Sequence, residues 1–201
     1  TALIPFDLKS DKERAGTVIK KALDAGHNYL GELEGLDILE SYGFSVLKTT
    51  LAKTPDQAAQ IAESTGYPVA MKIVSKQIIH KSDAGGVILR LENKEAVKAA
   101  FNKIIDNAKK YKSDAVIDGV IVQRMATPGQ EVILGMNRYK TFGPLIMVGL
   151  GGVFVEVFKD VAFGLAPLSR DDARRMINKI KGHKLFEGFR GMPVADTDTL
   201  E

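Results

Sequence analysis

The chain has 201 residues, of which 45% are hydrophobic and 26% are charged, and its formal net charge is only +3. This length allows one large domain or two small ones, and the nearly balanced charge argues against a nucleic-acid-binding surface. No cysteine occurs, which excludes disulfides, thiolate metal sites and cysteine nucleophiles and fits a reducing cytoplasm. The longest apolar run, residues 145–157, is interrupted by glycines and Glu156, so no membrane span is predicted.

The first half of the chain alternates predicted helices and strands. Apolar residues recur at helical spacing in two early segments, and Thr54-Pro55-Asp56-Gln57 is a capping sequence that starts a third helix. Asn93 is expected to cap a fourth helix, whose inward residues are Val97, Ala100, Phe101, Ile104 and Ala108. The first three helices are predicted over 10–26, 32–42 and 54–66, and the strands over 44–51, 68–74 and 86–91.

The second half is richer in strands, which are predicted over 119–125, 131–136, 145–148, 153–158 and 161–166. Ser169 is expected to cap a helix whose inward residues are Ala173, Met176, Ile177 and Ile180, and residues 182–201 show no strong period. The pattern predicts an α/β (α+β) fold of two lobes, with the handover between them near residue 115.

A lysine within an apolar strand is the first candidate site residue. Alternation places Lys72 on the face opposite Met71 and Ile73. An ammonium in such a strand is costly to bury unless it meets an anion, for example a phosphate. A lysine on an edge strand that points to solvent would show the same spacing, so both interpretations stay open.

The polar loop after this strand contains His80, followed by Lys-Ser-Asp-Ala and the pair Gly85-Gly86. His80 is either an ordinary surface histidine or a nucleophile for a phosphoryl group, because a neutral ring nitrogen is a good nucleophile. The paired glycines favour the second interpretation, because they let a backbone approach a ligand closely and their amides can form an anion-binding concavity.

Two further segments have the residue types of a nucleotide site. Gln123-Arg124-Met125 precedes a Pro-Gly turn and Glu131, an arrangement that suits a flat ring and sugar hydroxyls but also an ordinary hairpin. A loop with Gly149, Gly151 and Gly152 leads into the predicted strand that contains Glu156. Because a strand rather than a helix is expected there, the loop is neither a Walker loop nor a dinucleotide fingerprint, and Glu156 faces either a cleft or solvent.

Taken in this order, the motifs resemble the ATP-grasp domain of the ADP-forming (NDP-forming) acyl-CoA synthetases, a family that includes acetate–CoA ligase (ADP-forming) and is related to succinyl-CoA synthetase. The matching segments are 42–43, 66–72, 80–87, 122–125, Glu131, 142–144, 149–156, 159–160 and 165–168. The resemblance implies two lobes that clamp a nucleotide. Residues 1–30 would be a helical extension or linker, 31–115 the N-terminal lobe with a phosphohistidine loop, and 116–201 a C-terminal lobe that is incomplete.

The resemblance also implies roles for particular residues. His80 would be transiently phosphorylated and would pass its phosphate to ADP. Lys72 would bind ATP phosphates, the segment from Gln123 to Met125 would contact adenine, and Glu131 would hold the ribose hydroxyls. The main Mg²⁺ ligands are expected beyond Glu201. The complete set of implied nucleotide-binding residues is Lys72, Gly85, Gly86, Gln123, Arg124, Met125, Glu131, Gly151, Gly152 and Glu156.

The activity that the resemblance implies is the reversible conversion of acyl-CoA, ADP and phosphate to acid, CoA and ATP, with ATP/ADP and Mg²⁺ bound. A CoA-binding subunit or fused domain is required, within a cytoplasmic oligomer. The helix before Gly31 and the initial threonine indicate a piece of a fused synthetase. Two alternatives remain: a non-catalytic nucleotide-sensing module like those of fused acetyltransferases, and an ATP-grasp carboxylate–amine ligase, which has no need of His80.

Overall fold

The computed structural model describes residues 10–188, 191 and 193–201, with only the backbone of Val153, Phe154 and Glu156. It divides into two compact units, and the boundary lies between Ala126 and Thr127. The first unit therefore runs beyond the predicted handover near residue 115. The reason is that the last strand before the boundary returns to the first sheet and pairs with two earlier strands.

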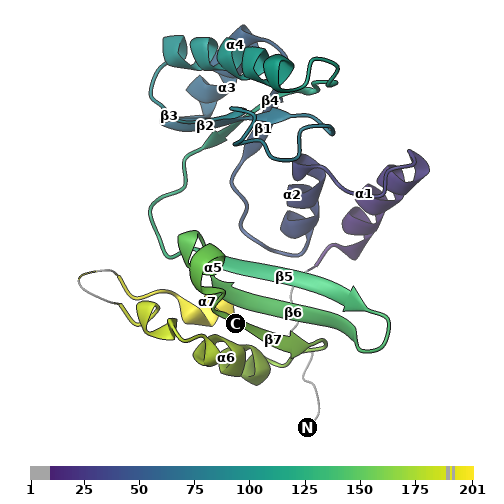
Figure 1. Ribbon diagram of the computed structural model, residues 1–201, viewed down its shortest axis with the longest axis vertical. Helices are drawn as coiled ribbons and strands as arrows, with labels where there is room; N and C mark the ends of the chain where they lie inside the picture. The colour runs from purple at the N-terminus through teal and green to yellow at the C-terminus, as the bar shows by residue number, and fades with distance from the viewer. Residues whose placement is uncertain (1–9, 189–190, 192) are drawn as a thin grey trace. The chain divides into compact units, whose positions relative to one another are not determined.

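The first unit contains a four-stranded antiparallel sheet in the order β1-β4-β2-β3 (Figure 1). Its elements are α1 (Lys12–Asp24), α2 (Glu32–Ser41), β1 (Thr49–Ala52), α3 (Pro55–Thr65), β2 (Val69–Val74), β3 (Val87–Leu91), α4 (Lys94–Tyr111) and β4 (Gly119–Arg124). The predicted strand over 44–51 begins only at Thr49, the residue that pairs with Gln123 near the end of β4.

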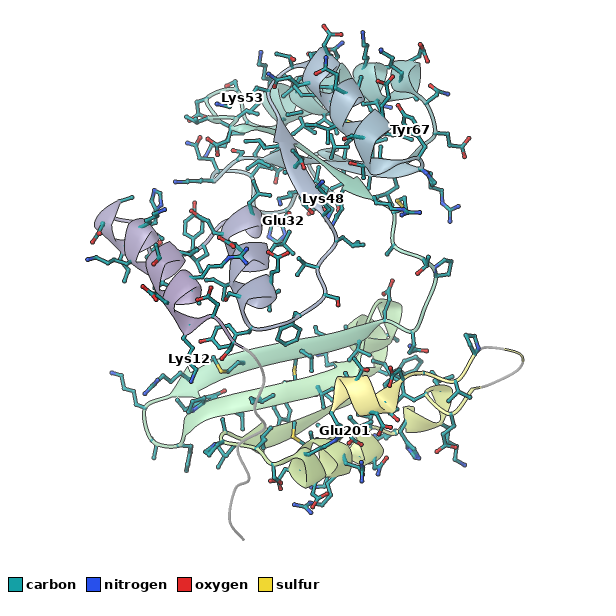
Figure 2. All side chains as sticks on the ribbon, turned by 180° about the vertical axis from the view of Figure 1, so that it is seen from behind. Lys12, Glu32, Lys48, Lys53, Tyr67 and Glu201 are labelled. Carbon is teal, nitrogen blue, oxygen red and sulfur yellow. The ribbon has the colours of Figure 1, made fainter. Side chains whose placement is uncertain are left out.

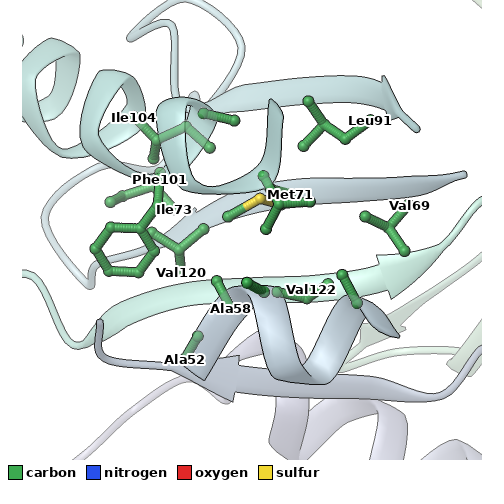
Figure 3. Close-up of a cluster of buried hydrophobic side chains, with 14 of the residues drawn as sticks. Ala52, Ala58, Val69, Met71, Ile73, Leu91, Phe101, Ile104, Val120 and Val122 are labelled. Atoms are coloured by element: carbon green, nitrogen blue, oxygen red, sulfur yellow. The ribbon is translucent and has the colours of Figure 1, made fainter. Parts of the chain in front are cut away.

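One face of this sheet is closed by α3 and α4, as the close-up in Figure 3 shows. Met71 and Ile73 of β2 and Val120 and Val122 of β4 are fully buried there. The prediction for the inward face of α4 is confirmed, because its five residues are all buried: Val97, Ala100, Phe101, Ile104 and Ala108. Burial of this apolar area is the main stabilising contribution to the unit.

The capping predictions for the first unit are confirmed. Thr54 Oγ1 accepts a hydrogen bond from the Gln57 amide at 3.2 Å, and Asn93 Oδ1 accepts one from the Ala96 amide at 2.9 Å. Each bond satisfies an amide that the first turn of a helix leaves without a partner. Helices α1 and α2 lie against each other, and Arg14 Nε donates to Asp37 Oδ1 at 2.6 Å across their contact.

The second unit contains a three-stranded antiparallel sheet in the order β5-β6-β7. Its elements are β5 (Val132–Tyr139), β6 (Gly143–Leu150), α5 (Val153–Phe158), β7 (Val161–Leu165), α6 (Arg170–Lys179), a 3₁₀ turn (His183–Leu185) and α7 (Thr197–Leu200). Helix α6 is capped by Ser169, as predicted, and packs Met176, Ile177 and the following Ile180 into the core of this unit.

The prediction of a strand over 153–158 is wrong, because this segment is the short helix α5. Its valines and phenylalanines favour a strand, but strand propensity is a weak preference that the surrounding structure readily overrides. The strand β6 ends at Leu150, and Gly152 then takes a backbone φ of +59° that redirects the chain. The helix stops at Lys159, whose backbone is in the left-handed region.

Among the described helices, none combines the length and hydropathy that a membrane-spanning segment requires.

Candidate functional site

A pocket of about 510 Å³ lies in the first unit, beside the loop between β2 and β3. It brings together two residues that the sequence singled out, Lys72 and His80. The complete lining is Glu32, Lys72, Ile79, His80, Lys81, Ser82, Asp83 and Val87. The pocket therefore combines an imidazole, two ammonium groups and two carboxylates, a composition that suits a phosphate-bearing ligand.

Lys72 does not lie on an edge strand. β2 is flanked by β4 and β3, and Lys72 pairs with Ile121 on one side and Val87 on the other. Its side chain is 29% exposed, and Nζ lies 3.1 Å from Glu32 Oε1. The alternative of an edge-strand lysine in solvent is thereby excluded, because the ammonium has a specific anionic partner inside the pocket.

Glu32 is a site residue that the sequence interpretation missed. It is the first residue of α2, and Figure 2 shows it at the end of α2 that is nearest the four-stranded sheet. One carboxylate oxygen accepts from Lys72, and the other accepts from Lys81. Partial burial by itself would raise the pKa of Glu32, but the hydrogen bonds from Lys81 and Lys72 outweigh it, so the pKa lies below its ordinary value of 4.5. Glu32 is thus an anion at neutral pH.

The sequence contained one weak signal for Glu32. A glutamate in the first turn of a helix is normally explained by the helix dipole, and Glu34 in the same turn has such a local role, since Oε2 accepts from the Gly31 amide at 2.6 Å. The partners of Glu32 lie 40 and 49 residues away in the sequence. Only the folded structure therefore distinguishes the role of Glu32 from that of Glu34.

His80 is an exposed residue at the start of a compact turn. The Ala84 amide donates to the His80 carbonyl oxygen at 3.2 Å, which fixes the backbone of the turn. In the part of the chain that the structure describes, no hydrogen bond or ion pair involves the imidazole ring itself. This exposed histidine lines the pocket, and no described residue engages its ring nitrogens, as a phosphoryl acceptor requires.

Gly85 and Gly86 shape the loop through contacts with the protein itself. A methyl group added at Gly85 would lie 2.7 Å from Asn107 Nδ2, and one added at Gly86 would lie 2.5 Å from Ile73 Cγ2. Their amides donate to the carbonyl oxygens of Ser82 and Lys81, at 3.0 and 2.8 Å. Close packing against α4 and β2 thus explains both glycines, and their predicted contact with a nucleotide stays a prediction.

The segment Gln123-Arg124-Met125 closes β4. Gln123 is half-buried and pairs with Ala70, and Arg124 is exposed. The Met125 amide donates to the Pro68 carbonyl oxygen at 3.1 Å, which extends the pairing of β4 with β2 by one bond. The strand end is therefore firmly held, whereas its predicted contact with adenine stays a prediction.

Within the second unit, Glu131 lies against the glycine loop that follows β6. The Gly151 amide donates to the Glu131 carbonyl oxygen at 2.7 Å. A methyl group added at Gly151 would lie 3.0 Å from the Glu131 carbonyl carbon, and one added at Gly152 would collide with the Glu131 carboxylate. The structure therefore brings together three of the predicted residues, in a close contact that favours glycine at both loop positions.

Two further predictions concern Glu156 and the metal ligands. Glu156 was placed on a strand, but its backbone belongs to helix α5, and its side chain lies outside the described residues. No group of three or more His, Asp or Glu among the described residues has the spacing to hold a metal ion. The expectation that the main Mg²⁺ ligands lie beyond Glu201 stays a prediction.

Comparison with known proteins gives a consistent result. Residues 21–201 match the ATP-grasp domain family. The β subunit of ADP-forming acetate–CoA ligase I from Pyrococcus furiosus is 46% identical over 187 residues, which are 93% of this chain and 80% of that protein. ADP-forming acetate–CoA ligase I from Archaeoglobus fulgidus is 43% identical over 97% of this chain, but the chain spans only 28% of its length.

A solved structure extends this similarity to the fold. The dinucleotide-forming acetyl-coenzyme A synthetase 1 of Ca. Korarchaeum cryptofilum, in complex with coenzyme A, Ca-AMPCP and HgCl⁺, superimposes with a TM-score of 0.89 at 44% identity. The match covers 92% of this chain and 80% of that one. The chain therefore belongs to the ATP-grasp family, together with the β subunits of ADP-forming acetate–CoA ligases.

Proposed function

We propose that this chain is the nucleotide-binding part of an ADP-forming acyl-CoA synthetase, in which His80 carries a phosphoryl group on its way to ADP. The observation that carries the proposal is the shared pocket of Lys72 and His80, where a nucleophilic ring lies beside an ammonium. A sensing module would need no reactive ring at this position. The named relatives support the acyl-CoA assignment, since they include acetate–CoA ligases and a 4-hydroxybutyrate–CoA ligase of Nitrosopumilus maritimus that is 46% identical.

The chemistry divides into two transfers at one nitrogen. A CoA-binding subunit or fused domain supplies the phosphoryl group, and a ring nitrogen of His80 forms an N–P bond as the bond to the donor breaks. An oxygen of the ADP β-phosphate then attacks the same phosphorus, the N–P bond breaks, and ATP and a neutral imidazole result. Each step exchanges one bond to phosphorus for another, so the two transfers can also run in reverse, in the direction of acyl-CoA synthesis.

The residues around His80 have supporting roles in this proposal. Lys72 neutralises the charge of the nucleotide phosphates, because positioning and charge stabilisation supply most of the catalysis in phosphoryl transfer. The segment Gln123-Arg124-Met125 would bind adenine, and Glu131 would bind the ribose hydroxyls. Gly151 and Gly152, which lie against Glu131, would also contact the nucleotide. Mg²⁺ would add further charge neutralisation when the nucleotide is bound.

Solved relatives support the use of a histidine. Structures of the Ca. Korarchaeum cryptofilum enzyme include one with a phosphorylated phosphohistidine segment, and another with Mg-AMPPCP in which that segment points towards the nucleotide binding site. These two chains are 42% and 41% identical to this one. The proposal for this chain is that His80 is the group that exchanges phosphate with the nucleotide.

The test is His80→Asn in the complete enzyme, with its CoA-binding part present. We expect loss of ATP formation and loss of acid-labile label from γ-labelled ATP, because asparagine has no ring nitrogen to accept phosphate. Mass spectrometry of the wild type should find the phosphate on His80. His27→Asn is the matched control, since His27 is in the same unit and, among the described residues, its ring hydrogen-bonds to Lys76 alone, with Nε2 2.6 Å from Nζ. Full ATP formation by the His80 variant contradicts the proposal.

A further inference from the structure

Two ammonium groups in the His80 pocket converge on a single carboxylate. Lys72 Nζ lies 3.1 Å from one oxygen of Glu32, and Lys81 Nζ contacts the other. The three side chains are between 25% and 29% exposed, so they are neither free in solvent nor sealed from it. One anion held by two cations at the rim of a pocket is the arrangement that a bound phosphoryl group would also adopt.

The charge of the pocket depends on where Glu32 is. With Glu32 in place, the lining contains two lysines, Glu32 and Asp83, so its formal charge is zero. Such a pocket attracts a polyphosphate weakly. If Glu32 leaves, the same lining carries a charge of +1, and both ammoniums lose the carboxylate that they share.

We propose that Glu32 is an internal substitute for phosphate, which occupies the anion site of Lys72 and Lys81 beside His80 and is displaced when a phosphoryl group binds. This inference rests on the proposed function, because it concerns the same pocket, and it adds Lys81 as the second phosphate-binding ammonium. Phosphate is the stronger partner, since it carries more charge and more acceptor oxygens than a carboxylate.

Displacement is possible because Glu32 is held mainly by the groups that the ligand would take over. It is the first residue of α2, and α2 packs chiefly against α1 rather than against the sheet. The lysines, in contrast, belong to the sheet and to the turn fixed by Gly86, whose amide donates to the Lys81 carbonyl oxygen. The anion therefore moves more easily than the cations do.

A competing anion has a measurable consequence. The apparent affinity for a ligand equals the intrinsic affinity multiplied by the fraction of molecules in which the site is open. Removal of the competitor raises this fraction and therefore raises the apparent affinity. It also leaves the two partly buried ammoniums unpaired, which makes ligand binding more dependent on salt. A merely structural Glu32 would give the opposite result, since its loss would disorder the lysines and weaken binding.

The test compares Glu32→Gln with Glu34→Gln in the complete enzyme, with Mg-AMPPCP as the probe in calorimetry at several KCl concentrations. Glutamine keeps the size of the side chain and removes its charge. We expect Glu32→Gln to bind the probe roughly fivefold more tightly and with a steeper salt dependence. Glu34→Gln should bind as the wild type does, because Glu34 caps the same helix turn without touching either lysine. Unchanged or weaker binding by a folded Glu32→Gln protein overturns the inference.

Lys81→Met provides a second test that does not depend on the stability of the Glu32 variant. We expect it to bind the probe roughly tenfold more weakly, and the gain from Glu32→Gln should shrink when both changes are combined. Wild-type affinity in Lys81→Met overturns the inference. If the wild type fails to bind Mg-AMPPCP, the proposed function and this inference fall together. If His80 is labelled but the glutamate and lysine variants behave as the wild type, only this inference falls.

Discussion

The two sheets of this protein bury their apolar residues to different extents. In the four-stranded sheet, α3 and α4 close one face, and Met71, Ile73 and Val122 have no exposed surface. In the three-stranded sheet, α6 packs on one face, whereas Phe163 and Leu165 alternate to the other face and remain 54% and 49% exposed. The first sheet thus has a filled core on the face opposite Lys72, and the second has an open apolar face.

This difference indicates where the geometry of the His80 pocket is determined. Met71 and Ile73 flank Lys72 in β2, and Ile73 Cγ2 is the atom against which Gly86 packs. The core therefore fixes both the strand that carries the ammonium and the loop that carries the imidazole. In the second unit, Glu131 is positioned by a glycine loop at the edge of a smaller core. Four comparisons of variants test this contrast.

The largest expected effect is that of a core truncation. Ile73→Ala should lower the free energy of unfolding by about 3 kcal/mol, because it leaves a cavity in a fully buried position. Phe163→Ala removes a larger side chain but should change stability by only about 0.5 kcal/mol, because the side chain is half exposed. Denaturant titration of the complete protein checks both. A cost above about 2 kcal/mol for Phe163→Ala would break the contrast and show that this face is covered.

A smaller effect is expected from a methyl group added at Gly86, in the loop that carries His80. Gly86→Ala should cost about 2 kcal/mol, since the new Cβ would lie 2.5 Å from Ile73 Cγ2 and 3.0 Å from the Lys81 carbonyl oxygen. The control is Gly129→Ala, where nothing lies within 4 Å of the added carbon.

The coupling between the core and the loop is measured in the double variant. Gly86→Ala should cost less in an Ile73→Ala background, because the colliding methyl group is gone. Additive costs in the two backgrounds would contradict the link between the core and the His80 loop.

The smallest effect compares the helix caps of the two units as pH falls. The hydrogen bond from the Ser169 hydroxyl, followed by those from the Ser169 amide and Arg175, lowers the pKa of Asp172 from 3.8 to about 2. Because the folded pKa is the lower one, this stabilisation is complete above about pH 4 and is lost as the pH falls towards 2. Loss of the N-cap in Ser169→Ala should cost about 1 kcal/mol at pH 7. The cost should be smaller at pH 2.5, where the carboxylate of Asp172 is partly protonated.

Thr54→Ala is the matched control for this titration. It removes an N-cap of the same type from α3, but the residue three positions on is Gln57, which does not titrate. Its cost of about 1 kcal/mol should be the same at both pH values. Thermal unfolding of both variants at pH 7 and pH 2.5 makes the comparison, and an equal pH dependence would show that Asp172 does not contribute through its cap.

The local sequence determined most of the secondary structure. Caps such as Thr54, Asn93 and Ser169 act within three residues of the helix that they start, so their effect can be predicted without the fold. Apolar periodicity likewise predicted the buried face of α4. It failed over 153–158, where the side chains favour a strand but the chain turns at Gly152 and forms a helix. Propensity there was weaker than the context.

The site shows the same division. Lys72, His80 and each glycine pair lie in short motifs, so the order of these motifs along the chain was sufficient to identify the family resemblance. Only the tertiary structure placed Lys72 in an interior strand, paired it with Glu32, and separated Glu32 from the neighbouring Glu34. Ion pairs between residues 40 or more positions apart leave no local pattern, since they depend on where the fold brings each side chain. Interactions between residues that are neighbours in the sequence could be predicted from it. Interactions between residues that are neighbours only in the folded chain required the structure.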